Sequence, residues 1–246
     1  MKMLFLGGCL LTTKTVEKEK RFINVLLSRN PQLDITLVRY ASFSLIEEIL
    51  LEQTTTFMPD VVIFLVRPFP FYTLTKLFPR VPSMKGGVEI KFHPRIFSCK
   101  EWFIENDRLI VEMDWNPNGT KRTLTHSINL LLGEILNLDE WALEYVKGKL
   151  LILNEHCRIK NIPLIIVGSP EVRNDKTERK LIEKLNNTLI AASSENRITF
   201  VNLFSRDFPE GMLGPDKVHY NEAGHFQLAK KIEEAVLKIP VSAKTM

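Results

Sequence analysis

Unbroken runs of apolar residues constrain the fold of this chain more than any other feature of its sequence. The clearest run is Val61-Val62-Ile63-Phe64-Leu65-Val66, which follows a break at Met58-Pro59-Asp60. A strand with one face in water alternates apolar and polar residues, whereas a strand covered on both faces is apolar throughout. This run therefore predicts a central strand of a sheet that has helices packed on both sides.

Similar strands recur along the chain, and helical patterns separate them. The expected strands are Lys2–Leu6, Asp34–Tyr40, Val61–Val66, Pro163–Gly168 and Ile198–Leu203. The expected helices cover about 13–29, a segment from Ser44 to about Leu50, 139–160, 175–193 and 221–238. Strands that alternate with helices indicate a parallel, doubly wound sheet. We expect one α/β domain over residues 1–246, a three-layer sandwich with a five-stranded parallel sheet.

Local signals mark several ends of these helices. Asn30-Pro31 stops the first helix, and Ser44 with Glu47 forms a capping box at the start of the second. Asp139 and Asn221 are expected to cap the helices that follow them.

Residues from about 68 to 138 do not fit the alternation and are too long for a plain connection. The segment has several prolines, two expected strands (Val88–Phe92 and Arg108–Met113) and an expected helix (Leu124–Leu136). We interpret it as a large insertion after the third strand. It would provide a substrate cover or a surface for a partner or homodimer contact, or it would have no role in catalysis.

The charge and the cysteines limit the classes of function. The net charge of +4 comes from 33 basic and 29 acidic residues that are well mixed, which argues against binding to nucleic acid. The three cysteines have no CxxC spacing, which argues against a disulfide framework or a structural zinc site and suits a reducing cytoplasm. His93, His126 and His156 lack metal-ligand spacing, so we expect neither a metal nor a cofactor.

Three other possibilities have little support in the sequence: a lipoprotein, a membrane-spanning protein and a nucleotide-binding module. Leu6-Gly7-Gly8-Cys9 resembles a lipoprotein cleavage box, but too few residues precede it for a signal segment, and a buried first strand accounts for the same residues. No apolar run approaches the ~20 residues that span a membrane. A nucleotide-binding module is disfavoured because there is neither a GxGxxG nor a GKS/T motif.

Asp216 and His219 form the most informative local pattern. They lie three residues apart, after a Gly214-Pro215 turn and before the helix that Asn221 caps. A carboxylate at this spacing can hold one ring nitrogen of the imidazole and leave the other free to act as a base. His225, six residues further on, is expected on a face of the helix and outside the mechanism.

A nucleophile for this base is available at the other end of the chain. Cys9 follows the first strand, at a strand-to-helix turn, and the segment with Asp216 and His219 follows the fifth strand. The carboxyl ends of parallel strands meet at one edge of a sheet, so we expect Cys9 and His219 to lie close together there. The alternative interpretation of Cys9 is a small buried apolar residue.

The order of the elements, the Gly-Gly-Cys turn and the block Asp216-Lys217-Val218-His219-Tyr220-Asn221-Glu222-Ala223-Gly224-His225 resemble the SGNH (GDSL-type) hydrolase family. The resemblance covers most of the chain outside the insertion. It implies a flavodoxin-like sandwich and the hydrolysis of an ester, a thioester or a related acyl group. It also places Asp216 and His219 on the DxxH positions of the family.

The chain departs from the family pattern at three places. Cys9 stands where the family has the nucleophilic serine, and it keeps a nucleophile because a thiol of pKa ~8.5 beside a histidine is partly ionised. No glycine is present in Ala41-Ser42-Phe43-Ser44, so the second backbone donor falls on Ser42. Phe69 replaces the asparagine of the oxyanion hole, and loss of such a donor lowers rates by roughly 10²–10³. Arg67 either turns inward to supply a cation or is a solvated residue at the strand end.

Two functions are therefore compared. In the first, an esterase, thioesterase or acyltransferase uses a Cys9-His219-Asp216 triad on a small-molecule or carrier-bound acyl substrate. Its oxyanion hole consists of the backbone N–H groups of Cys9 and Ser42, with Arg67 as the added cation. In the second, the chain is a catalytically degenerate binding or scaffolding protein that contacts a partner through aromatic residues of the insertion: Phe92, Trp102 and Trp115.

Overall fold

A single mixed sheet lies at the centre of the protein. The computed structural model describes residues 1–7, 11, 16–39, 46–66, 95–98, 138–170, 176–204, 211–214 and 219–239. The strands are β1 (Lys2–Gly7), β2 (Asp34–Arg39), β3 (Val61–Leu65), β4 (Arg95–Ser98), β5 (Leu164–Val167) and β6 (Thr199–Val201). Their order across the sheet is β4-β2-β1-β3-β5-β6.

Five of these strands are parallel, as the sequence predicts. β1 pairs with β2 and with β3, β3 pairs with β5, and β5 pairs with β6, all in parallel register. β4 is a sixth strand that the sequence did not indicate, and it pairs antiparallel with β2. The strands expected at Val88–Phe92 and Arg108–Met113 and the helix expected at Leu124–Leu136 lie outside the described residues.

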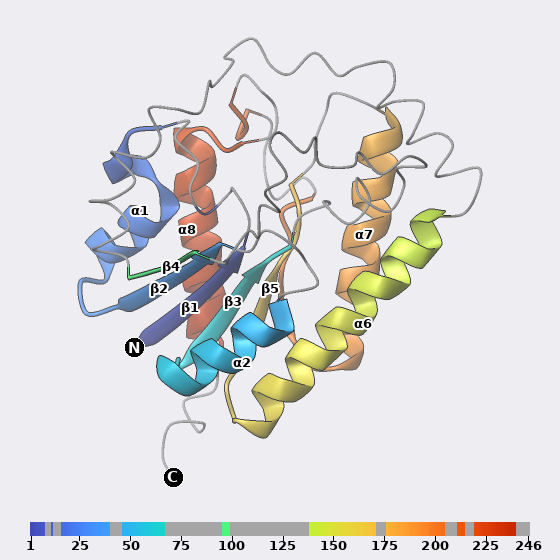
Figure 1. The fold of residues 1–246 in the computed structure, drawn as a ribbon. Coiled ribbons are helices and arrows are strands. Elements are labelled where there is room, and N and C mark those ends of the chain that lie inside the picture. The colour runs from blue at the N-terminus through green and yellow to red at the C-terminus, as the bar shows by residue number, and fades with distance from the viewer. Residues whose placement is uncertain are drawn as a thin grey trace, which may run out of the picture.

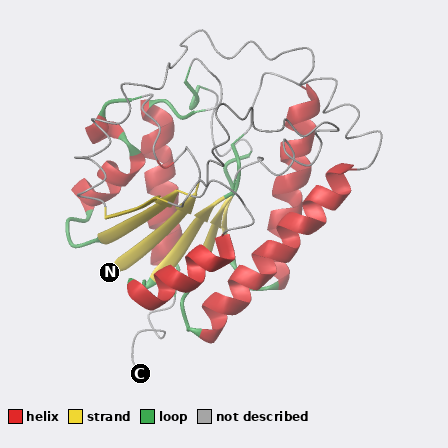
Figure 2. Ribbon diagram, viewed as in Figure 1, coloured by secondary structure: helices red, strands yellow, loops and turns green. Residues whose placement is uncertain are grey.

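Helices cover both faces of the sheet, which makes the α/β sandwich. α1 (Phe22–Arg29) and α8 (Glu222–Leu237) lie on one face. α2 (Ile46–Thr56), α6 (Leu138–Ile159) and α7 (Lys176–Glu195) lie on the other (Figures 1 and 2).

The side chains of each apolar strand are shared between two cores, one on each face of the sheet. This explains why apolar and polar residues do not alternate in these strands. Successive side chains of a strand point to opposite faces of the sheet. In β3, Val61, Ile63 and Leu65 therefore pack toward α1 and α8, whereas Val62 and Phe64 pack toward α2, α6 and α7. All five side chains are buried.

Two expected helix starts are wrong. The helix expected over 13–29 is a short 3-10 turn, η2 (Lys18–Lys20), followed by α1, because Arg21 has extended backbone angles (φ −72°, ψ 143°) between them. Asp139 does not cap α6 but lies in its first turn, where its buried carboxylate pairs with the Lys184 ammonium of α7. The cap expected from Ser44 lies outside the described residues.

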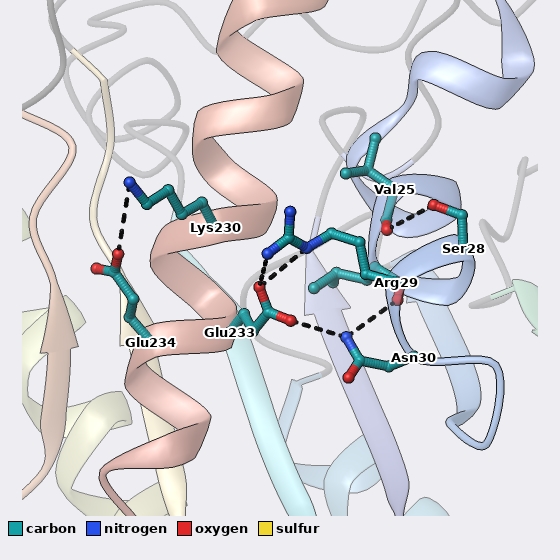
Figure 3. A network of polar contacts seen from close by, with 8 residues as sticks. Val25, Ser28, Arg29, Asn30, Lys230, Glu233 and Glu234 are labelled. Atoms are coloured by element: carbon teal, nitrogen blue, oxygen red, sulfur yellow. Dashed lines mark hydrogen bonds and ion pairs between the residues drawn. The ribbon is translucent and has the colours of Figure 1, made fainter.

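An ion pair and a hydrogen bond join the C-terminal end of α1 to the C-terminal half of α8. Arg29 Nη2 lies 2.9 Å from Glu233 Oε2, and Asn30 Nδ2 donates to Glu233 Oε1 at 2.9 Å (Figure 3). The hydrogen bond from Asn30, with the nearby Arg29 cation, lowers the pKa of the Glu233 carboxyl. These contacts fix the C-terminal end of α1 beside α8.

Candidate functional site

The chain reverses its direction of travel across the sheet between β1 and β3. From β1 it passes to β2 on one side, and it then returns to β3 on the other side of β1. In doubly wound sheets, ligands bind outside the carboxyl ends of the strands at such a switch point. In the sequence, Cys9 follows β1 by two residues and Arg67 follows β3 by two.

Most of the predicted site residues lie in segments outside the described residues. These are Cys9, Ser42, Arg67 and Asp216, together with Phe69. His219 is described, and the structure defines what holds it.

Backbone hydrogen bonds fix the segment that contains His219. The N–H of Gly214 donates to the His219 carbonyl at 2.7 Å, and the N–H of Asn221 donates to the Met212 carbonyl at 3.0 Å. An antiparallel bridge between Leu213 and Tyr220 lies between these two bonds. His219 therefore stands on a closed turn, half-buried, directly before α8.

Asn221 caps α8 as the sequence predicts. Its Oδ1 accepts a hydrogen bond from the N–H of Gly224 at 2.9 Å, and its Nδ2 donates to the carbonyls of Gly211 and Leu213. The same side chain thus satisfies the helix start and holds the preceding strand-like segment. Gly224 has no room for a side chain because a Cβ there would lie 2.1 Å from the Met212 carbonyl oxygen.

A row of rings connects β1 to the turn that bears His219. Phe5 of β1 contacts Phe22 of α1 edge-on at 5.8 Å between ring centroids. The ring of His225 stacks on Phe22 at 6.1 Å and meets Tyr220 edge-on at 5.7 Å. Phe5 lies four residues before Cys9, and Tyr220 directly follows His219. The two ends of the chain are therefore packed against each other beside the switch point.

His225 lies on the buried face of α8 and is 1% exposed. Its Nδ1 accepts a hydrogen bond from the N–H of Phe22 at 3.3 Å, so it satisfies the first amide of α1. Burial, together with the nearby charges of Arg21 and His219, lowers the pKa of His225 to about 4. Nε2 has no hydrogen-bond partner within the described segments. The sequence placed His225 outside the mechanism and gave no sign of this contact across 203 residues.

Ser169 and Asn186 are two further polar residues at this edge that the sequence did not indicate. Both are 1% exposed. The Ser169 hydroxyl donates to the Val66 carbonyl at 2.9 Å, at the end of β3. The sequence contained part of this signal, because Ser169 follows a buried strand by two residues, as Cys9 does, but Asn186 lies in the middle of a charged helix.

A groove of about 720 Å³ lies beside the His219 turn, between η2, α1 and the first turns of α8. Its volume is in the range of small-molecule sites. The groove is lined by Glu19, Lys20, Val25, Met212, Asn221, Glu222, Ala223, Phe226 and Gln227.

The described part of the chain holds no group of three or more His, Cys, Asp or Glu residues placed as metal ligands. Within the same residues, every helix is too short or too polar to cross a lipid bilayer.

Solved structures with the same fold include esterases and a lipolytic protein. A member of the lipolytic G-D-S-L family from Veillonella parvula has a TM-score of 0.56 at 13% identity, covering 97% of this chain and 100% of its own. The acetyl xylan esterase AlAXEase has a TM-score of 0.57 at 14% identity, covering 96% of this chain and 100% of its own. A catalytic mutant of the acetylxylan esterase Axe2 from Geobacillus stearothermophilus has a TM-score of 0.55 at 15% identity, over 96% of this chain and 93% of its own.

No protein-family model matches the sequence, and no curated protein matches it either. The similarity to the solved structures defines the fold. The described residues of this chain have the α/β fold of the lipolytic G-D-S-L protein and the acetylxylan esterases.

Proposed function

We propose that this protein is an esterase, thioesterase or acyltransferase that works through Cys9, His219 and Asp216. The observation that carries the proposal is the position of His219, on a hydrogen-bonded turn directly before α8. The row of rings from Phe5 to Tyr220 supports the pairing, because it packs the strand leading to Cys9 against that turn. The fold of the esterases supports the same class of reaction.

The proposed reaction proceeds through an acyl-thioester. His219 takes the proton of the Cys9 thiol, and the thiolate attacks the carbonyl carbon of an ester or thioester. The backbone N–H groups of Cys9 and Ser42, with the Arg67 cation, stabilise the negative oxygen of the tetrahedral intermediate. The intermediate expels the alcohol or thiol, which receives the proton from His219. Water or an acceptor, deprotonated by His219, then releases the acyl group from the sulfur.

Asp216 would hold the other ring nitrogen of His219 and stabilise the imidazolium that forms at each step. The groove beside Asn221 is large enough for an acyl group and has apolar walls from Val25, Met212 and Phe226. We therefore propose a small-molecule or carrier-bound acyl substrate.

Turnover of p-nitrophenyl acetate and of an acyl-thioester tests the proposal. His219→Ala should lower kcat/KM by roughly 10²–10⁴, the usual contribution of a positioned base. His156→Ala is the matched control, because His156 is a half-buried histidine on α6, on the other face of the sheet. Equal turnover by His219→Ala and the wild type would refute the proposal.

Covalent labelling tests the nucleophile separately. Burial raises the pKa of the Cys157 thiol to about 12, so Cys157 stays protonated and does not react in the folded protein. In a Cys99→Ala background, a thiol-directed acyl probe at pH 7 should therefore label Cys9 alone. Undiminished labelling after the further change Cys9→Ala would show that Cys9 is not the nucleophile.

One observation favours a second function, that of a binding or scaffolding protein with the same fold. Phe69 stands where the esterase family has the asparagine of its oxyanion hole, and a phenyl ring cannot donate a hydrogen bond. In that case the wild type and His219→Ala would share the same background rate, and the 68–138 segment would carry the partner surface.

A further inference from the structure

The exit of β5 is tied to the exit of β3 through a serine hydroxyl. Val66 N–H donates to the Val167 carbonyl at 2.9 Å, and among the described residues this is the last backbone bond between the two segments. The Val66 carbonyl is buried, and the Ser169 hydroxyl donates to it at 2.9 Å. A buried carbonyl without a donor is costly, so this hydroxyl completes the pairing where the strands end.

Asn186 of α7 fixes the main chain of Ser169 from the other side. Its Oδ1 accepts from the N–H of Ser169 at 3.0 Å, and its Nδ2 donates to the Ser169 carbonyl at 2.9 Å. The two bonds allow one orientation of the Ser169 backbone. Gly168 makes the approach of Asn186 possible, because a Cβ there would lie 2.4 Å from Asn186 Oδ1 and 2.8 Å from Phe200 Cζ.

We propose that Ser169 is a positioning residue of the site, held by Asn186, and that it sets how the chain leaves β3 at the switch point. The Val66 carbonyl belongs to the peptide bond that joins Val66 to Arg67, so the bond from Ser169 fixes the plane of that peptide. The segment that begins there starts with Arg67, the cation of the proposed oxyanion hole. The catalytic consequence rests on the proposed function, whereas the fixing of the β3 exit does not.

Amide hydrogen exchange tests the structural step without any substrate. Ser169→Ala should speed exchange of the Val66 amide about tenfold, as expected for the loss of one buried hydrogen bond. The amide of Val62 is bonded to the Pro163 carbonyl at the opposite end of β3 and should be unchanged. Ser193→Ala is the matched control, because Ser193 is also 1% exposed and its hydroxyl has no hydrogen-bond partner in the described segments.

Equal exchange of the Val66 amide in Ser169→Ala and Ser193→Ala would overturn the proposal. Should Ser169→Ala be too unstable to purify, Asn186→Asp provides a second measurement. It keeps the acceptor for Ser169 N–H and loses the donor to the Ser169 carbonyl. The same rise in Val66 exchange is expected.

Kinetics test the catalytic step. With p-nitrophenyl acetate, Ser169→Ala should lower kcat about tenfold with KM nearly unchanged, because the Arg67 cation and not the binding surface is displaced. Ser169→Thr, which keeps the hydroxyl, should restore kcat. A kcat of Ser169→Ala equal to that of Ser193→Ala would refute the positioning role. Absence of turnover in the wild type would instead refute the proposed function, and the exchange comparison would still decide the role of Ser169 at the β3 exit.

Discussion

Protonation of the buried His225 should control the acid stability of this protein. The pKa of His225 is about 4 in the folded protein, against 6.5 for an unperturbed imidazole. Between these two values the unfolded chain binds a proton that the folded chain does not, so the free energy of unfolding falls as the pH falls. At about 1.4 kcal/mol for each pH unit, the total loss is about 3 kcal/mol between pH 6.5 and pH 4. Below about pH 4 both states carry the proton and this loss stops.

The structure gives the cause of this behaviour. Nδ1 of His225 accepts from the N–H of Phe22, so a proton on Nδ1 would remove the acceptor and leave the first amide of α1 unsatisfied. The charges of Arg21, directly before α1, and of His219, before α8, also oppose protonation.

His225→Asn tests the reasoning, because the amide side chain can accept a hydrogen bond but does not titrate. Urea unfolding of the wild type and the variant should be compared at intervals from pH 7 to pH 4. The variant should be less stable at pH 7, because it loses the ring contacts with Phe22 and Tyr220, and this difference should shrink by about 3 kcal/mol at pH 4. Carboxyl groups titrate in both proteins, so their contribution cancels in the difference between the two free energies of unfolding.

A difference that stays constant across this range would refute the reasoning. His156→Asn is the control. Burial lowers the pKa of this half-buried histidine too, so a change in the same direction is expected, and a smaller one because the ring is less buried.

Further substitutions test the packing by urea unfolding. Gly168→Ala should lower the free energy of unfolding by roughly 1–3 kcal/mol, because the methyl group would overlap Asn186, and an unchanged value would contradict the geometry. Gly148→Ala on α6 has nothing within 4 Å of the new methyl group and should raise the free energy by roughly 0.5–1 kcal/mol. Asn221→Ala should cost about 1 kcal/mol, and Asn221→Ser should recover most of it. Glu233→Gln should cost less than about 1 kcal/mol, and the cost should shrink in 1 M salt.

The sheet could be predicted from the sequence because its signal is local. Strands such as Val61–Leu65 are apolar at every position, and this property follows from burial on both faces. The start of α1 could not be predicted in this way. Helical spacing continues back through Val16, yet Arg21 is extended and α1 begins at Phe22, whose amide meets His225 from the other end of the chain. A tertiary contact overrides the local pattern there.

The candidate site was predictable to the extent that it depends on strand order and helix capping. The His219 turn and the Asn221 cap follow from a short motif, and the structure agrees with both. Ser169 and Asn186 could not be recognised because a serine after a strand and an asparagine within a helix are common. Their role appears only when the exits of β3 and β5 are seen side by side.

The antiparallel strand β4 gives the segment between β3 and α6 a place in the sheet. β4 pairs with β2 from Thr36↔Ser98 to Arg39↔Arg95. It therefore lies at the edge of the sheet, on the side of β2 that faces away from β1. Without β4, the six residues of β2 would form an edge strand with unpaired N–H and C=O groups, to which a strand of another copy can pair. A shortened protein in which a brief linker replaces residues 68–137 should therefore aggregate, although it keeps Cys9, Arg67 and His219. β4 thus covers the edge of β2 from Thr36 to Arg39 and leaves no unpaired backbone there for a second copy to bind.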